Sequence, residues 1–461
     1  MKIATRAHQT LLVTVLVGLV TSCASYTTKT SGALRDFRMG RFVSSQEDFL
    51  DTERTGSAFL SGAEAGTAAL TAGDWDTAIE HFQRAVAAAE DLDGRGIAGV
   101  DSLAEGLASW VLNDTTQAYH GEGFERVYVH ACLALAYLAK GQLDSVYVEA
   151  RLANQLLETE EELYDADYGA GGLGHFISGI AYELIGEPDQ AYVDYVRMAE
   201  KDVGTGLAGP ALLRLGEALR REDDLPRWRE RFGTAIERPA NAASVVVIAG
   251  VGLAPYKVEG TFWLPTDDGV FALAVPSYQL RPQGVWDLRL SERVSGVSVL
   301  TDALERVDEV GPANLEDRIA WTAVKSGTRG LIKRGITRNL EKDHGSAGRL
   351  IGDLFAIATE RADLRSWTTL PASWQAARLW VEPGEVDLEL EAVGGEVVDL
   401  GRYALDPGET MIVLARTVDA RLYAHAIGGA RLASVDEAQT NGGADVLAGG
   451  TAASTTGVDP R

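Results

Sequence analysis

The spacing of hydrophobic positions changes along the chain, and each change marks a different structural region. From about Ala58 to 235, Ala-rich and Leu-rich segments place apolar residues at helical spacing, interrupted by single glycines. After a short polar stretch around Pro239, the apolar runs become short, β-branched or aromatic, and are bounded by Gly, Pro and Asp, as in strands. This order predicts an α+β chain of several domains, with a helical array before the strands.

Four helical segments resemble the tetratricopeptide repeat, in which small residues let two antiparallel helices approach and an aromatic residue fills the gap. They contain Gly66, Gly73, Ala78, Phe82 and Ala85; Leu133, Ala134, Tyr137, Gly141, Ala150 and Ala153; Gly179, Tyr182, Gly186, Ala191 and Tyr195; and, as the weakest match, Leu215, Gly216, Leu219, Trp228 and Phe232. Gly73, Gly141 and Gly186 stand where a first helix must end and turn. Their unequal spacing predicts an irregular tetratricopeptide-like array rather than a regular solenoid.

The second half of the chain reads as a mixed α/β region that ends in a small antiparallel β-sheet. Strands are predicted at 245–248, 262–265 and 270–275, and a glycine-interrupted helical pattern covers 314–360. Near residue 386 apolar and acidic residues alternate, with Val386, Leu388 and Leu390 on one face, which is typical of a half-buried strand with one acidic face.

The N-terminus has the layout of a secretory signal peptide. Lys2 and Arg6 precede an apolar stretch of about ten residues, which as a helix would reach roughly 15 Å, about half of a membrane core. The stretch ends at Cys23 in the run Val20, Thr21, Ser22, Cys23, which resembles the lipobox of bacterial lipoproteins. The resemblance implies a diacylated Cys23 as the new N-terminus. An ordinary signal peptide that contains a Cys near its cleavage site is the alternative.

These patterns divide the chain into six regions. They are a lipoprotein signal peptide (1–22), a lipidated tether (23–55), a tetratricopeptide-like helical domain (56–235), a mixed strand and helix region (244–378), a small antiparallel β-sheet domain (379–420) and a polar tail without enough apolar residues to order itself (433–461).

Composition narrows the classes of function. The 461 residues include 42 basic and 67 acidic side chains, a net charge of −25, so the surface repels nucleic acid. The acids are spread along the chain, which favours a role in solubility. If Cys23 is acylated, Cys132 has no partner within the chain, and its apolar helical surroundings predict a small core residue.

Residues 169–174 spell G-x-G-x-x-G, but their setting does not favour a dinucleotide site. That fingerprint requires a preceding strand, whereas the residues around this segment follow a helical pattern. A flexible connector between helix pairs is the better interpretation. Asp165 and Asp167 begin like a calcium loop, yet Gly169 takes a ligand position and Phe176 stands where the bidentate Glu is needed.

No catalytic, cofactor or metal motif is recognisable in the sequence. The seven histidines form no H-E-x-x-H pair, two cysteines are too few for a cysteine-rich zinc site, and neither a G-x-S-x-G elbow nor a phosphate loop is present. We therefore predict a protein that is not an enzyme, with no catalytic residues, no cofactor and no metal.

A predicted helix at 325–342 has a basic face. Lys325, Arg329 and Lys333 follow one another at four-residue intervals. Such a run is usually a solvated face. The alternative is contact with the protein's own acidic sheet or with an anionic envelope component.

Four further passages resemble an uncharacterised family of bacterial lipoproteins with a tetratricopeptide-like N-terminal half. They are 113–126, 148–151, 252–257 and, as the most specific, the run from Asp363 to Pro371. The chain departs from the family in having Leu364 where Thr is usual. The family has no assigned activity, so the resemblance implies no functional residue. Physically, Asp363 can pair with Arg365 while Trp367 anchors the chain as it passes from helix to sheet, as a structural clasp or, alternatively, a binding site.

The sequence as a whole predicts an outer membrane lipoprotein that faces the periplasm and acts as a non-enzymatic scaffold for unidentified envelope proteins. Ala24 after the Cys, rather than Asp, favours the outer membrane where sorting follows that rule. Paired helices would leave a concave groove for an extended segment of a partner. The alternatives are a cell-wall or glycolipid enzyme with an unrecognised site, and a structural subunit of a surface or secretion assembly.

Overall fold

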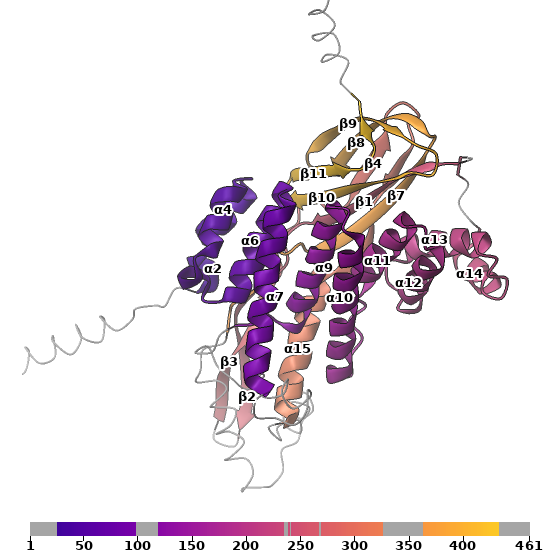
Figure 1. Cartoon of the computed structure of the whole chain (residues 1–461). Helices are drawn as coiled ribbons and strands as arrows, with labels where there is room; N and C mark the ends of the chain where they lie inside the picture. Colours follow the sequence, from indigo (N-terminus) through magenta and orange to yellow (C-terminus); the bar gives the residue numbers. More distant parts are fainter. Residues whose placement is uncertain are drawn as a thin grey trace, which may run out of the picture.

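The structure of the chain, a computed structural model, describes residues 25–97, 119–234, 238–239, 241–266, 269–325 and 363–432. Helices fill the first half and two β-sheets the second, so the predicted order of a helical region followed by antiparallel sheets is confirmed (Figure 1). The helices are α2 (Tyr26–Lys29), α3 (Ser31–Arg38), α4 (Phe42–Leu50), α5 (Thr52–Thr55), α6 (Ala58–Ala72), α7 (Trp75–Ile97), α9 (Gly123–Ala139), α10 (Leu143–Tyr164), α11 (Gly172–Leu184), α12 (Pro188–Glu200), α13 (Thr205–Ala218), α14 (Leu225–Phe232) and α15 (Val307–Lys325).

The turns between successive helices lie where the sequence places them. Gly73, Gly141 and Gly186 follow α6, α9 and α11 with φ of 79°, 68° and 77°, a left-handed backbone that glycine adopts without a steric cost. Cys132 lies inside α9 at 1% exposure, which confirms it as a core residue.

The strands form two five-stranded sheets and a hairpin. They are β1 (Ala243–Val251), β2 (Tyr256–Thr266), β3 (Gly269–Gln279), β4 (Leu288–Glu292), β5 (Ser298–Leu300), β6 (Asp302–Arg306), β7 (Ser373–Val381), β8 (Gly384–Ala392), β9 (Val397–Leu405), β10 (Thr410–Val418), β11 (Arg421–Ile427) and β12 (Ala430–Arg431). The first sheet has the order β11-β10-β1-β7-β6, the second β12-β9-β8-β4-β5, and β2 pairs with β3.

The first sheet is the middle layer of three. All nine residues of β1 are buried, which explains why its sequence is a continuous apolar run. Val245 and Val247 pack with the second sheet, whereas Val246 and Ile248 join the core formed with the helices. The second sheet has a solvated outer face, because Val386, Leu388 and Leu390 point inward and the acids between them outward, as predicted.

The predicted boundary at residue 379 falls within β7. This strand pairs with β1 from the preceding region, and β1 also pairs in parallel with β10 from the following one. The predicted regions 244–378 and 379–420 therefore form one body of two sheets rather than a mixed region and a separate small sheet. A one-dimensional pattern does not show which strands pair over long sequence distances.

The predicted tether of residues 23–55 is wrong for the part that the structure describes. Residues 26–55 form the short helices α2 to α5. Phe37 and Phe49 are 0% exposed, and Tyr26 is 5% exposed. These few aromatic anchors order a segment whose polar composition suggested a linker.

Candidate functional site

The segment 363–371 joins the helices to the sheets. Arg365 Nη2 lies 2.7 Å from Asp363 Oδ2, which confirms that pairing. Trp367 is 1% exposed, packs 6.1 Å from the Phe82 ring, and donates its indole N–H to Thr67 Oγ1 at 3.0 Å. The predicted anchoring by Trp367 is thus confirmed.

Two buried glutamates of the helices hold the backbone of this segment. Glu64 accepts the N–H of Thr368 at 2.7 Å and the N–H of Thr369 at 2.9 Å. Glu125 accepts the N–H of Trp367 at 2.7 Å. Burial raises the pKa of Glu125 to about 7, although Lys257 partly offsets this effect.

A buried charge cluster, formed by Glu122, Lys257 and Arg318, adjoins this junction. The side chain of Lys257 is 0% exposed and pairs with Glu122, and Arg318 Nη1 lies 2.8 Å from the other oxygen of that carboxylate. Burial acts to raise the pKa of Glu122, but the two cations outweigh it and hold the pKa below its usual value. The carboxylate therefore stays charged and ties β2 and α15 to the start of α9.

Arg416 of β10 completes the contacts of the junction with the sheet. Its guanidinium donates to the carbonyls of Gly250, Gly252, Thr369 and Thr417. Burial lowers the pKa of Arg416 to about 9, which leaves it charged at neutral pH. These buried charges are engaged with neighbouring protein groups, so we interpret them as structural.

The glycine-rich segment 169–174 connects α10 to α11, as predicted. A Cβ on Gly172 would lie 2.3 Å from the Leu304 carbonyl of β6, so glycine is needed for close approach. Glu305 Oε1 accepts the Gly171 N–H at 2.6 Å. The protein's own carboxylate therefore occupies the helix start that a dinucleotide phosphate would require.

Burial raises the pKa of Glu305 to about 7, although the N–H groups of Gly171 and Leu173 oppose this. In the unfolded chain the Glu305 carboxyl deprotonates near its ordinary pKa of 4.5. The folded state therefore holds this proton to higher pH, and the free energy of unfolding falls as the pH rises from about 5 to 7. We expect Glu305→Gln to reduce this pH-dependent decrease in the free energy of unfolding by on the order of 2–3 kcal/mol, measured by urea unfolding at several pH values across that range. Glu309→Gln, which changes a side chain that is 69% exposed, should keep the wild-type profile. A Glu305→Gln profile parallel to wild type would contradict the expectation.

One histidine lies near a serine and an aspartate without forming a nucleophile and base pair. Asp194 accepts from the Ser178 hydroxyl at 2.7 Å, and its other oxygen lies 2.8 Å from His175 Nδ1. The carboxylate thus stands between the two groups, whereas an activated serine must contact the imidazole.

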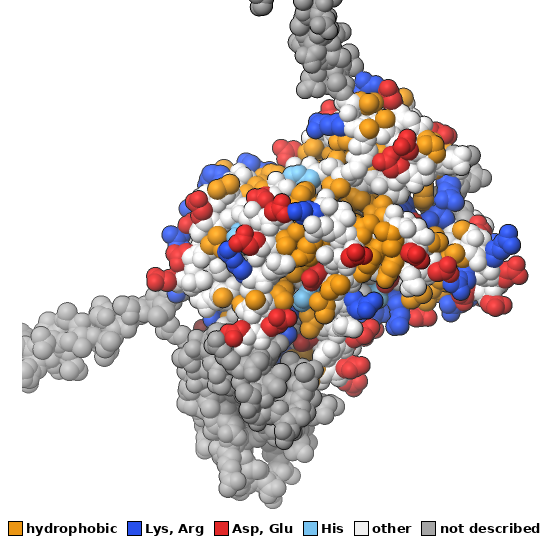
Figure 2. All heavy atoms as spheres, in the orientation of Figure 1, with side chains coloured by type: hydrophobic (Ala, Val, Ile, Leu, Met, Phe, Trp, Pro, Cys, Tyr) orange, Lys and Arg blue, Asp and Glu red, His pale blue; other side chains and the backbone are white. Residues whose placement is uncertain are grey.

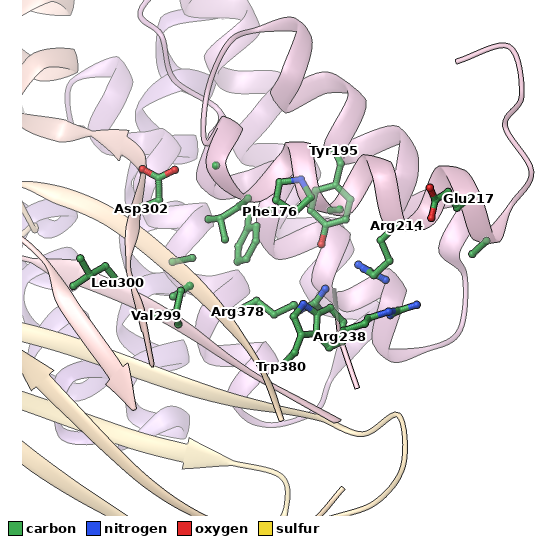
Figure 3. A pocket seen from close by; sticks show the side chains of 17 residues that line it. Phe176, Tyr195, Arg214, Glu217, Arg238, Val299, Leu300, Asp302, Arg378 and Trp380 are labelled. Carbon is green, nitrogen blue, oxygen red and sulfur yellow. The ribbon is translucent and has the colours of Figure 1, made fainter. Parts of the chain in front are cut away.

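An open pocket of about 410 Å³ lies between α11, α12 and α13 on one side and β5 and β7 on the other. Figure 3 shows Arg214, Arg238, Arg378 and Trp380 together at one end and Asp302 and Leu300 at the other. The guanidinium carbons of the three arginines lie 5.4, 5.2 and 5.2 Å from the Trp380 ring centre. Over much of its inner face the helical region packs against the first sheet, and this pocket is one place where the two remain apart.

Glu183, which does not itself line the pocket, forms ion pairs with two of these arginines. It lies 2.7 Å from Arg214 Nη2 and 3.0 Å from Arg378 Nη1, and the Tyr195 hydroxyl donates to it at 2.7 Å. Burial alone would raise the pKa of Glu183, but the two guanidiniums lower it below its usual value. One carboxylate therefore balances two largely buried cations at the end of the pocket near Trp380, while the acidic Asp302 lines the opposite end.

The sequence patterns did not reveal this pocket. Arg378 and Trp380 are two residues apart on β7 and so share one face with Trp374 and Ala376, the residues of β7 that pack on the helices. Arg378, a cation on an otherwise apolar face of a strand, was the sequence feature that could have indicated the pocket. Arg214 and Arg238 come from distant segments, which only the fold brings together.

Several sequence predictions lie outside the described residues, among them the signal peptide at 1–22 and the polar tail at 433–461. Cys23 precedes residue 25, and nearly all of the basic face 325–342 falls between residues 325 and 363. Within the described ranges, no helix is long and apolar enough to cross a membrane, and no group of three or more His, Cys, Asp or Glu side chains is arranged to hold a metal ion. On the face drawn in Figure 2, acidic and basic side chains are scattered among neutral ones.

Comparison with known proteins gives little similarity. No protein-family model and no curated protein matches the chain. Among solved structures, the apo form of RapI aligns with a TM-score of 0.29 and 11% identity over 50% of this chain. The chain spans 58% of the length of RapI. Neither a shared fold nor a function follows from a TM-score of 0.29.

Proposed function

We propose that the protein is a lipid-anchored, non-enzymatic binding module of the bacterial envelope. It is held at the outer membrane through Cys23, faces the periplasm, and holds a segment of another envelope protein in the pocket between α13 and β7. The signal-peptide and lipobox patterns support the location. The pocket itself is the observation that carries the binding role.

The contrast between the pocket and the buried charge cluster supports binding rather than catalysis. The side chains of Glu122 and Lys257 are 2% and 0% exposed and are paired with each other. At the pocket, by contrast, apolar and cationic side chains border an open volume. This combination suits a ligand held by contact. The irregular tetratricopeptide-like arrangement of the helices is part of the same proposal, because such helix pairs commonly present extended segments of partners with a surface.

In-cell crosslinking tests the proposal. We expect a photo-crosslinking amino acid at Leu300, which lines the pocket and is 49% exposed, to capture a discrete envelope protein. The same residue at Val43, which is 71% exposed on α4, should not capture that protein. A Cys23→Ser variant should lose both labelled fatty acid and the captured band.

Four outcomes would contradict this proposal. Equal capture from positions 300 and 43 would show that the pocket is not the contact. Fatty acid incorporation by Cys23→Ser would reject the lipid anchor. Release of fragments from cell-wall material by the purified protein would favour the enzymatic alternative, and capture of a second copy of the chain would favour a structural assembly.

A further inference from the structure

We infer that the pocket between α13 and β7 recognises a carboxylate on an extended polypeptide segment. The inference rests on the proposed binding function and adds the chemistry of the ligand. Its basis is the arrangement of Arg378, Arg214 and Arg238 around Trp380 (Figure 3).

Arg378 lines the pocket, and one edge of its guanidinium has no hydrogen-bond partner. Its Nη1 is bound to Glu183, while Nε and Nη2 are buried and have no hydrogen-bond partner in the structure. These two N–H groups form the planar fork that a carboxylate accepts bidentately. A buried donor without a partner costs free energy, so a ligand that supplies two oxygens there is favoured.

The charges of the pocket favour an anion. Glu183 balances only one of the two buried guanidiniums, and Arg238 adds a third cation at 5.2 Å from the same indole ring. Of the two acids that line the pocket, Glu217 pairs with Arg229 at 2.9 Å and Asp302 lies at the opposite end, so the positive charge is confined to the end near Trp380. On a chain of net charge −25, this local positive site is a specific feature and not part of a general basic surface.

Apolar residues line the rest of the volume. Phe176, Leu207 and Pro210 come from the helices, and Val299 and Leu300 come from β5. A volume of about 410 Å³ exceeds what one carboxylate group needs. The ligand should therefore carry an apolar side chain beside its carboxylate.

Backbone groups at the pocket suit a polypeptide. β5 ends the second sheet, and Val299 is paired with Leu290 of β4 between the hydrogen-bonded pairs 292–297 and 288–301. By antiparallel alternation the N–H and C=O of Ser298 and Leu300 point away from β4. An edge of this kind can bind an extended segment. On the opposite wall, Pro210 has no N–H, so the Gly206 carbonyl lacks its usual helical donor and can accept one from a ligand.

Fluorescence anisotropy with three labelled pentapeptides tests the inference. The first ends in Val-Leu with a free C-terminal carboxylate, the second is the same peptide with an amidated C-terminus, and the third is amidated and carries Glu before its last residue. We expect the first or the third to bind the full-length protein at least about tenfold more tightly than the second. Binding of the first alone identifies a chain terminus as the ligand, and binding of the third identifies an acidic side chain.

Variants connect the binding to the arginines. Arg238→Gln changes an exposed side chain, and Arg378→Lys keeps the charge beside Glu183 but removes the fork. Each should weaken binding about tenfold. Arg227→Gln is the matched control, because Arg227 lies 4.1 Å from the centre of the Trp228 ring outside the pocket and should bind as wild type does.

Several results would overturn the inference. They are equal binding of the neutral amidated peptide, unchanged binding by both Arg238→Gln and Arg378→Lys, and displacement by inorganic phosphate where acetate has no effect. Capture at position 300 without any peptide binding would reject the inference about the carboxylate but not the proposed binding of an envelope protein. Peptide binding without capture in cells would reject the proposed envelope partner but not the recognition of a carboxylate.

Discussion

Replacing Glu122 with Gln is expected to lower the free energy of unfolding by about 3–5 kcal/mol, the largest effect we predict together with that of Trp367. The side chain of Lys257 is 0% exposed and pairs with this carboxylate, and Arg318 lies 2.8 Å from its second oxygen. Removing the negative charge leaves the buried ammonium of Lys257 without its paired carboxylate. Chemical denaturation of the single variant measures the cost.

A double variant separates the charge pair from its surroundings. Glu122→Gln combined with Lys257→Met removes both partners, so it should recover part of the stability that Glu122→Gln alone loses. Glu217→Gln is the control, because its partner Arg229 is 52% exposed and this surface pair should contribute about 1 kcal/mol or less. If Glu122→Gln costs no more than Glu217→Gln, the buried charge cluster does not stabilise the junction.

Replacing Trp367 with Ala should cost about 3–5 kcal/mol as well, for a different reason. This side chain is 1% exposed and fills the space between the helices and the segment 363–371, beside Phe82 at 6.1 Å. Its removal leaves a cavity and two threonine hydroxyls, of Thr67 and Thr369, without their indole donor.

Two further variants serve as controls in thermal and denaturant unfolding. Trp367→Phe keeps most of the volume and should lose about 1–2 kcal/mol, chiefly the hydrogen bonds. Trp286→Ala, at a residue that is 59% exposed, should be nearly neutral. A Trp367→Ala variant as stable as Trp286→Ala would contradict the clasp.

Local patterns predicted those elements whose burial repeats along the sequence. The alternation at Val386, Leu388 and Leu390 marked β8 and its acidic face, and the apolar run of β1 marked a strand, which the structure shows to be buried on both sides. The turn glycines and the core position of Cys132 followed in the same way. In each case neighbouring residues alone determine the environment.

Long-range pairing and sparse anchors were not predictable in this way. The helices of residues 26–55 depend on Phe37 and Phe49, which pack against the rest of the protein and give too few apolar positions for a period. The boundary at 379 was misplaced because β7 pairs with a strand more than a hundred residues away.

The residues of the buried charge cluster and of the pocket were not predicted, because charged residues are common in the sequence and their proximity arises only in the fold. Among 67 acids, nothing distinguishes Glu122 or Glu183 until the fold surrounds them with cations. Arg214, Arg238 and Arg378 likewise come from a helix, a connecting segment and a strand. Only Arg378 stood in a context, an otherwise apolar strand, that hinted at a special role.

The ordered start of the chain fixes how an acylated molecule would stand on a bilayer. Tyr26 is 5% exposed and its hydroxyl donates to Glu64 at 2.8 Å, so the folded body begins three residues after Cys23. Three residues span at most about 10 Å. The folded body would therefore stay close to the lipid surface and could not reach across the periplasm. Figure 1 places α2 on the opposite side of the molecule from α13. In an acylated molecule the bilayer would therefore border the α2 side, and the proposed binding pocket would lie away from it, so that a ligand would have to reach the height of the pocket above the lipid surface.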